Sequence, residues 1–171
     1  MAESLVHTIL GLFNGLTSLK YGKELIVFII SLMPILELRG GLIAAALLGL
    51  NVVPAFIICL IGNLLPIPFI LWLITPIFNW LKKTKHLSKL VDKIEKKALK
   101  KKDKIEKAEF FGLLFFVGFP LPGTGGWTGS LIAALIDMDK KKALCAITLG
   151  VILAGLIVGS LSFGLLKGIL G

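Results

Sequence analysis

The sequence predicts an all-α integral membrane protein built as an inverted repeat, each repeat being a re-entrant helical hairpin followed by a transmembrane helix. The first observation is composition: 56% of the 171 residues are hydrophobic, 17% are charged, and the mean hydropathy is +0.94. The second is three charge-free runs, at residues 40–81, 110–136 and 143–166, each longer than the roughly 20 residues that span a bilayer core. The third is an internal similarity between the two halves of the chain.

Residues 1–23 are predicted to form an amphipathic interfacial helix that packs on the membrane bundle. Apolar residues recur on one helical face, namely Leu5, Ile9, Leu12, Phe13 and Leu16. A secretory signal would instead carry positive charge near its start and a compact apolar block before a small-residue cleavage site. Glu3 and the spread of the apolar residues argue against a signal, so we expect this segment to be retained.

Residues 24–81 are predicted to form the first repeat. Pro34 and the glycines at 40 and 41 separate two apolar stretches of nine residues each, 25–33 and 42–50. Each stretch makes about 14 Å of helix, or half a bilayer. Two half-length helices joined by a Pro/Gly turn predict a re-entrant hairpin that reaches the midplane and returns to its own side. Residues 52–81 then cross the membrane, with kinks expected at Pro66, Pro68 and Pro76.

Residues 82–108 are predicted to form a basic amphipathic helix. Twelve of the nineteen basic residues lie between Lys82 and Lys107, and three more follow at 140–142. Basic residues in short loops beside membrane spans mark the cytoplasmic side, so both segments should face the cytoplasm. Apolar residues at helical spacing favour a helix lying along the inner membrane surface, and a solvated helical linker is the alternative. Nucleic acid is not favoured as a partner, because no aromatic residues are interleaved with these lysines.

Residues 109–171 are predicted to form the second repeat. Residues 110–119 and 127–136 flank the breaker PLPGTGG and again have half-bilayer length. With Lys82 in the cytoplasm, the first hairpin enters from the outside and the second from the cytoplasm, so the repeats are inverted. Their tips should then meet near the membrane midplane, where inverted-repeat transporters place substrate sites.

The repeat is visible in the sequence itself. Aligning LRGGLIAA, which begins at Leu38, with WTGSLIAA, which begins at Trp127, gives five identities in eight positions. A one-residue shift then pairs Gly62 with Gly150. Both motifs follow a proline and precede a long apolar run, which favours a true repeat over a chance similarity.

Glu37 and Arg39 are the only charged residues between Leu25 and Leu81, so we predict that they form a functional site. Arg39 is the only arginine in the chain, and a guanidinium keeps its proton and binds phosphate through two parallel hydrogen bonds. Burial and the neighbouring arginine act on Glu37 in opposite directions, which makes this carboxyl group the candidate for proton coupling. A structural ion pair is the alternative. Asn63, in the following span, either lines the site or bonds another helix.

The tip of the second hairpin is predicted to complete the substrate site. Its glycines let backbone amides approach a ligand, and the helix that follows directs the positive end of its dipole at the midplane. Two hydroxyl groups and one indole donor add hydrogen-bonding capacity. Glycines present only for a tight turn and for packing are the alternative. The substrate-binding candidates here are Gly123, Thr124, Gly125, Gly126, Trp127 and Thr128.

These motifs carry a family resemblance. PILELRGGLIAAALLGLN, IGNLLPIPF and FPLPGTGGWTGSLIAAL together resemble the small multidrug export protein family, which is similar to the wider DedA (SNARE-associated/VTT) superfamily. The resemblance spans nearly the whole chain and implies a DedA-like fold with membrane-embedded acidic and arginine residues. Some DedA relatives carry undecaprenyl phosphate across the bacterial inner membrane. DedA proteins usually have an arginine in the second hairpin as well, and its absence here argues against a two-arginine phosphate clamp.

We therefore expect a transporter or flippase that moves an amphiphilic anion, best matched by a polyprenyl-phosphate carrier lipid, across the inner membrane. Arg39 and the second tip would hold the phosphate, and Glu37 would couple transfer to protons. Proton-coupled efflux of small cationic drugs is an alternative, although the fixed charge of Arg39 would repel a cation. A non-transporting scaffold, which binds anionic lipid or a partner through residues 85–104, is another.

An enzyme is not expected, because no nucleophile and base or set of metal ligands is apparent. His7 has no second ligand nearby and is interpreted as a surface residue. Cys59 and Cys145 lie in apolar runs and are interpreted as small packing residues. We expect no cofactor and no metal. The expected partners are membrane lipids and a small amphiphilic substrate, and the small size of the chain suggests a homodimer.

Overall fold

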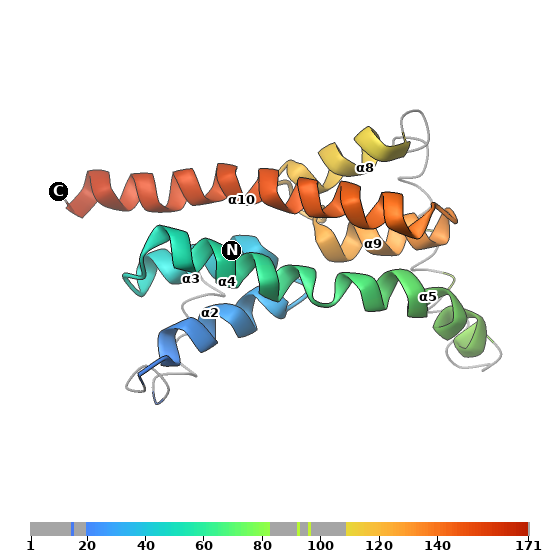
Figure 1. Ribbon diagram of the computed structural model, residues 1–171, viewed down its shortest axis with the longest axis horizontal. Helices are drawn as coiled ribbons and strands as arrows, with labels where there is room; N and C mark the ends of the chain where they lie inside the picture. The colour runs from blue at the N-terminus through green and yellow to red at the C-terminus, as the bar shows by residue number, and fades with distance from the viewer. Residues whose placement is uncertain (1–14, 16–19, 83–91, 93–95, 97–108, 171) are drawn as a thin grey trace. The chain divides into compact units, whose positions relative to one another are not determined.

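The computed structural model describes residues 15, 20–82, 92, 96 and 109–170, and every regular element in these ranges is an α-helix (Figure 1). The all-α prediction is therefore confirmed for the described chain. The predicted interfacial helix at 1–23 and the basic helix at 82–108 lie almost wholly outside the described residues. In chain order the helices are α2 (Gly22–Leu32), α3 (Glu37–Leu47), α4 (Val52–Leu64), α5 (Ile67–Lys82), α8 (Glu109–Gly118), α9 (Gly126–Leu135) and α10 (Lys140–Leu170).

The helices belong to two compact units, and each unit combines one short helical hairpin with parts of two longer helices. Unit 1 comprises Met1–Leu65 together with Val151–Gly171, and unit 2 comprises Pro66–Gly150. Unit 1 thus contains α2, α3, α4 and the second part of α10, which is drawn from orange to red in Figure 1. Unit 2 contains α5, α8, α9 and the first part of α10.

Hairpin 1, made of α2 and α3, is antiparallel. A lysine bridges the two helices at the end of the hairpin away from the turn. Residues 33–36 connect the two helices. Lys23 Nζ, near the start of α2, donates a hydrogen bond to the carbonyl oxygen of Leu48, just after α3, at 2.9 Å. Each of the two helices has 11 residues, or about 16 Å at 1.5 Å per residue.

Three helices of unit 1 meet closely around Ser31 of α2. A Cβ atom built on Gly41 of α3 would overlap the Ser31 hydroxyl group and lie 2.9 Å from Cys59 Sγ of α4. A Cβ built on Gly62 of α4 would lie 2.9 Å from the carbonyl oxygen of Phe28 and 3.1 Å from Ser31 Cβ. Only glycine fits at either position, so the close approach of α2, α3 and α4 depends on both.

Unit 2 contains a corresponding junction around Val117 of α8. A Cβ built on Gly129 of α9 would lie 2.5 Å from Val117 Cγ2, and one built on Gly150 of α10 would lie 2.7 Å from the carbonyl oxygen of Leu114. The same Cβ on Gly150 would lie 2.8 Å from Val117 Cβ. Hairpin 2, made of α8 and α9, therefore packs against α10 much as hairpin 1 packs against α4, and α5 packs on α9.

The second helices of the two hairpins end in the same backbone motif. Gly49 after α3 has φ +69° and Asp137 after α9 has φ +58°. The amide of Leu50 bonds the carbonyl of Ala45 at 3.0 Å, and the amide of Met138 bonds the carbonyl of Ala133 at 3.0 Å. The amides of residues 49 and 137 also bond the carbonyls of Ala46 and Ala134, at 3.1 and 3.3 Å, and each pair of bonds forms a Schellman cap that satisfies the last carbonyls of its helix.

The position of two glycines differs from the sequence prediction. Gly40 and Gly41 were expected in the turn of hairpin 1, with the second helix starting after them, but α3 already begins at Glu37. The turn consists of residues 33–36, and both glycines lie inside the helix. Gly41 is used for the close contact with Ser31 and Cys59 rather than for breaking the helix.

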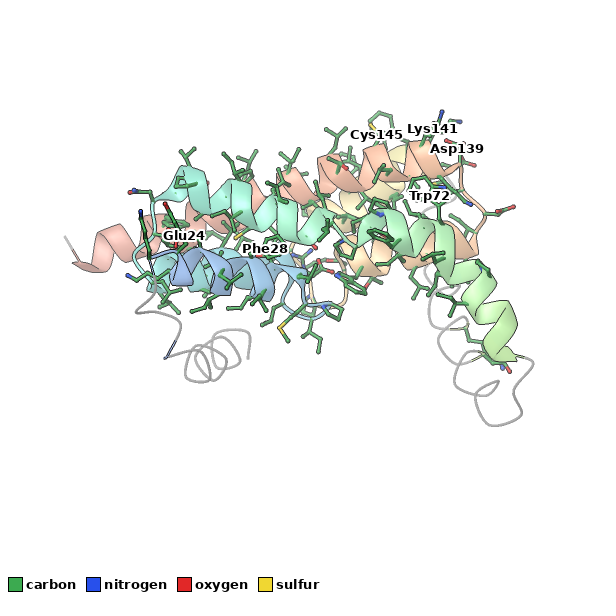
Figure 2. All side chains as sticks on the ribbon, turned by 60° about the horizontal axis from the view of Figure 1, so that its bottom comes forward. Glu24, Phe28, Trp72, Asp139, Lys141 and Cys145 are labelled. Carbon is green, nitrogen blue, oxygen red and sulfur yellow. The ribbon has the colours of Figure 1, made fainter. Side chains whose placement is uncertain are left out.

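The surface of the described helices is that of a membrane protein. Two segments are long and apolar enough to cross a bilayer, at Val52–Ile74 and Lys140–Gly164, and only 28% and 33% of their apolar windows are buried. Figure 2 shows the outward side chains, including Trp72 of α5, which is 46% exposed. Large apolar side chains recur at every fourth position along α4 and α5 and are exposed: Val53, Ile57, Ile61, Leu65, Phe69, Leu73 and Ile77. Exposed apolar side chains in this number suit lipid and not water.

The first long helix is interrupted where a proline predicts it. α4 ends at Leu64 and α5 begins at Ile67, so the break coincides with Pro66. Pro68 lies in the first turn of α5, where a missing amide is tolerated, and Pro76 lies inside α5. The predicted packing role of cysteine holds for Cys59, which is buried, but is wrong for Cys145, which is exposed on α10 (Figure 2).

Candidate functional site

Glu37 is held inside unit 1 by an unusual backbone conformation. It is the first residue of α3, with φ +52°, and its side chain is only 5% exposed. Its amide donates a hydrogen bond to the carbonyl oxygen of Met33 at 2.9 Å, and Gly40 bonds Leu36 in the same way at 2.8 Å. A left-handed conformation of a residue other than glycine costs about 1–3 kcal/mol and persists only where its surroundings fix it. The turn therefore commits this carboxyl group to the interior.

Arg39 lies two residues further along α3 and is half-buried. The charges of Arg39 and Glu37 attract one another. Attraction between opposite charges reduces the cost of placing either charge away from water, although buried charges rarely stabilise a fold relative to apolar residues. The two opposite charges thus nearly cancel one another at the turn end of hairpin 1.

Asn63 places a second polar side chain in the interior of unit 1. It lies near the end of α4 and is 2% exposed. Its Oδ1 atom is buried and accepts no hydrogen bond. A buried acceptor without a donor costs about 1–3 kcal/mol. We therefore expect this atom to meet a donor in another state of the protein or on a ligand.

The tip of hairpin 2, residues 119–125, is closed by the side chain of Thr124. The single proton of its hydroxyl group is shared between the carbonyl oxygens of Phe119 and Leu121, which lie 2.8 and 2.7 Å from the hydroxyl oxygen. Gly123 has φ +77° and Gly125 has φ +135°, so both need glycine. The hydroxyl of Thr124, proposed from the sequence as a ligand for substrate, is thus engaged in shaping the turn.

The start of α9 presents the other predicted site residues of unit 2. Gly125 is the N-cap residue and Gly126 the first helical residue, and both are buried. Trp127 and Thr128 follow in the first turn and are half-buried. Amides at a helix N-terminus attract anions, and that this end of α9 binds an anion stays a prediction.

The structure brings the predicted site residues together in two groups. Glu37, Arg39 and Asn63 belong to unit 1, and the six residues 123–128 belong to unit 2. That the two groups line one pocket stays a prediction. Among the described residues, no three His, Cys, Asp or Glu side chains are placed to hold a metal ion.

Sequence reasoning missed Ser31 in the interior of unit 1. Ser31 is fully buried at the junction of α2, α3 and α4, where its hydroxyl donates to the carbonyl of Val27 at 2.8 Å and interacts with the thiol of Cys59. The available signal was a hydroxyl residue near the end of an apolar stretch, three positions before Pro34.

Apolar helices with exposed apolar faces, enclosing a carboxylate, a guanidinium and an amide, define a membrane protein with an internal polar site. The comparisons with known proteins are consistent with that class. The chain belongs to the family described as "Putative small multi-drug export protein", whose model matches residues 37–157. No curated protein and no solved structure matches the chain significantly.

Proposed function

We propose that this protein is a membrane transporter for an amphiphilic anion, and that Arg39 binds the anionic headgroup. The observation that carries the proposal is the buried Glu37 beside Arg39 at the closed end of hairpin 1. Ionisable residues at membrane depth are rare and usually functional. The family description, which refers to export, supports transport as the general activity.

The proposed membrane arrangement follows from the lengths of the helices. The helices of both hairpins have 10 or 11 residues, which is about half of a bilayer core. Val52–Ile74 and Lys140–Gly164 have 23 and 25 residues and can cross it. In this proposal both hairpins are re-entrant in the inner membrane, with the lysine-rich segment at 82–107 in the cytoplasm.

The recurrence of specific contacts supports an inverted repeat. Ser31 of hairpin 1 meets one glycine of its own hairpin and one of the next helix, Gly41 and Gly62, and Val117 of hairpin 2 does the same with Gly129 and Gly150. The Schellman caps after α3 and α9 recur at the same spacing. Recurring contacts of this kind are expected of two copies of one structural unit.

In the proposed mechanism, Arg39 binds two oxygens of a phosphate headgroup and Glu37 carries the coupled proton. The amides at the start of α9 provide a second anion-binding surface. The lipid tails stay in the bilayer, so the protein needs only to enclose the headgroup. A polyprenyl phosphate fits these requirements, and the similarity of the sequence motifs to the DedA superfamily is what suggests that substrate in particular.

Export of small cationic drugs is the second candidate, and the family description favours it. In that mechanism Glu37 would bind a proton and a cation alternately. The nearby charge of Arg39 opposes cation binding, which is why we rank it second. Drug-susceptibility tests in a host without its own efflux pumps would distinguish the two candidates. The scaffold hypothesis concerns residues 85–104, of which all but 92 and 96 lie outside the described residues.

The test is a liposome assay that follows the accessibility of the headgroup of a labelled polyprenyl phosphate, with and without a pH gradient. Arg39→Lys keeps the charge but removes the two parallel donors, so we expect transport to fall at least about tenfold, the effect of one lost charge-assisted hydrogen bond. Lys141→Arg, at an exposed position of α10, is the control and should transport normally. Normal transport by Arg39→Lys would exclude the proposed role of Arg39.

A further inference from the structure

The unsatisfied Oδ1 atom of Asn63 lies at the same level of unit 1 as Glu37. α3 and α4 follow one another through a short connection and run antiparallel, and they touch where Gly41 meets Cys59. Glu37 precedes Gly41 by four residues and Asn63 follows Cys59 by four, so each lies about one turn from the contact, on the contact face and towards the same end. Both side chains are almost completely buried, at 5% and 2% exposure.

Two acceptors at this level cannot satisfy one another while the carboxyl group is ionised. A carboxylate only accepts hydrogen bonds, and so does the Oδ1 atom of an asparagine. A protonated carboxyl group has one O–H donor. Adding one proton to Glu37 would therefore supply the donor that Asn63 Oδ1 lacks.

We propose that Asn63 Oδ1 accepts a hydrogen bond from the protonated carboxyl group of Glu37, and that this pair is the proton-holding site of the transporter. The inference rests on the proposed role of Glu37 in coupling. One proton from the aqueous phase bonds to a carboxylate oxygen of Glu37 and is released in the reverse step, and no other bond is made or broken. Asn63 is a positioning residue, since it acts through Glu37.

The pair also explains how a proton and an anion would be coupled. In the ionised state, Glu37 competes with an anionic headgroup for Arg39, because both are negative. Protonation removes that competitor, and the hydrogen bond to Asn63 stabilises the neutral carboxyl group. Proton binding and anion binding therefore favour one another, and by linkage the effect is reciprocal.

No other described titratable group of unit 1 competes for this role. On α3 the neighbouring charge is Arg39, and on α4 the titratable side chain is the buried Cys59 thiol. The charged residues of α2 are Lys23 and Glu24, at the opposite end of the hairpin, where Lys23 bonds Leu48. In unit 1, the side chains of α10 are described for residues 151–164, and none of these is ionisable.

The test is a pH titration of the purified protein in lipid nanodiscs by infrared difference spectroscopy. The carbonyl band of a protonated carboxyl group that disappears in Glu37→Gln belongs to Glu37. Asn63→Leu replaces the amide by an apolar group of similar size, and we expect the midpoint pH of this band to fall by about one unit, a tenfold loss of proton affinity from one buried hydrogen bond. Asn51→Leu, at an exposed position just before α4, should leave the midpoint unchanged.

Each result decides the proposal without deciding the transport function. An unchanged midpoint in Asn63→Leu would overturn it, and a raised midpoint would overturn it too, because it would mean that the amide NH₂ group stabilises the ionised carboxylate. If Asn63→Leu does not fold, the wild-type band decides: a frequency typical of a hydrogen-bonded carboxyl supports the pair, and that of an unbonded carboxyl refutes it. The two proposals can fail separately. If Arg39→Lys loses transport while the carbonyl band of Asn63→Leu keeps its midpoint, the proposed function stands and only the role of Asn63 is removed.

Discussion

Hairpin 1 and hairpin 2 share a packing scheme and differ in chemistry. In each, one residue of the first helix, Ser31 or Val117, meets a glycine on the second helix and another on the following long helix. The second helix of each hairpin ends in a Schellman cap. Yet the sequence alignment places Glu37 opposite Gly126 and Arg39 opposite Thr128. The comparison teaches that the backbone arrangement does not require the charges, so the charges in hairpin 1 need a functional explanation.

The largest expected effect tests the shared packing. Gly62→Val and Gly150→Val would each force a side chain against a backbone carbonyl, 2.9 Å away at Phe28 and 2.7 Å away at Leu114. Because backbone cannot move aside cheaply, we expect both variants to lose about 3 kcal/mol or more and to yield little folded protein. Recovery of monodisperse protein in detergent measures this loss.

The control for both variants is Gly164→Val. A Cβ atom at Gly164 meets nothing within 4 Å, so this variant should be recovered like the wild type. Normal recovery of only one of the two glycine variants would show that the junctions of units 1 and 2 are not equivalent.

The next prediction tests the chemical difference between the hairpins. Glu37→Gln keeps the size of the side chain but cannot exchange a proton, so we expect transport in liposomes to lose its dependence on a pH gradient, a reduction of about 100-fold in the gradient-driven rate. Asp137→Asn is the matched control, because Asp137 follows hairpin 2, also has a positive φ, and is exposed. If both variants lost the dependence, or neither did, proton coupling would not be confined to hairpin 1.

A smaller effect separates the two tips. The hydroxyl of Thr124 closes the tip of hairpin 2 by sharing its proton between two carbonyl oxygens, whereas the tip of hairpin 1 relies on Pro34 and backbone bonds. Thr124→Val should therefore lower the stability of the protein by about 1–2 kcal/mol. Thr124→Ser keeps the hydroxyl and should restore most of the loss. Heating in detergent followed by size-exclusion chromatography measures both, and equal losses would mean that these bonds contribute nothing.

The smallest expected effect concerns the two buried serines. Ser31 bonds the carbonyl of Val27 and interacts with Cys59, while Ser130 bonds only the carbonyl of Gly126, at 2.6 Å, among the contacts described. Ser31→Ala should lower stability by about 1 kcal/mol and Ser130→Ala by about 0.5 kcal/mol, because each loses a hydrogen bond that is already worth little net. The same heating assay applies. A larger loss in Ser130→Ala would reverse the order we derive from the contacts.

The sequence predicted much of the fold because the relevant signals are local. Apolar runs of defined length, Pro34 and the PLPGTGG segment were sufficient to predict two pairs of short helices and two long ones, and Pro66 to predict the break between α4 and α5. The candidate site was found in the same way, since Glu37 and Arg39 are conspicuous in a charge-free stretch. The prediction that Gly40 and Gly41 lie in the turn was wrong, because a glycine pair is equally compatible with a turn and with a close contact between helices.

The sequence by itself thus determined that this is a helical membrane protein, and which of its residues can carry charge. Composition and the length of apolar runs are properties of single segments, so they can be evaluated without the tertiary structure. Only the tertiary structure decided that Ser31 joins three helices, that Thr124 closes a turn, and that Asn63 Oδ1 is buried at the level of Glu37 without a donor. These features depend on which side chains from separate helices meet, and no local pattern encodes that.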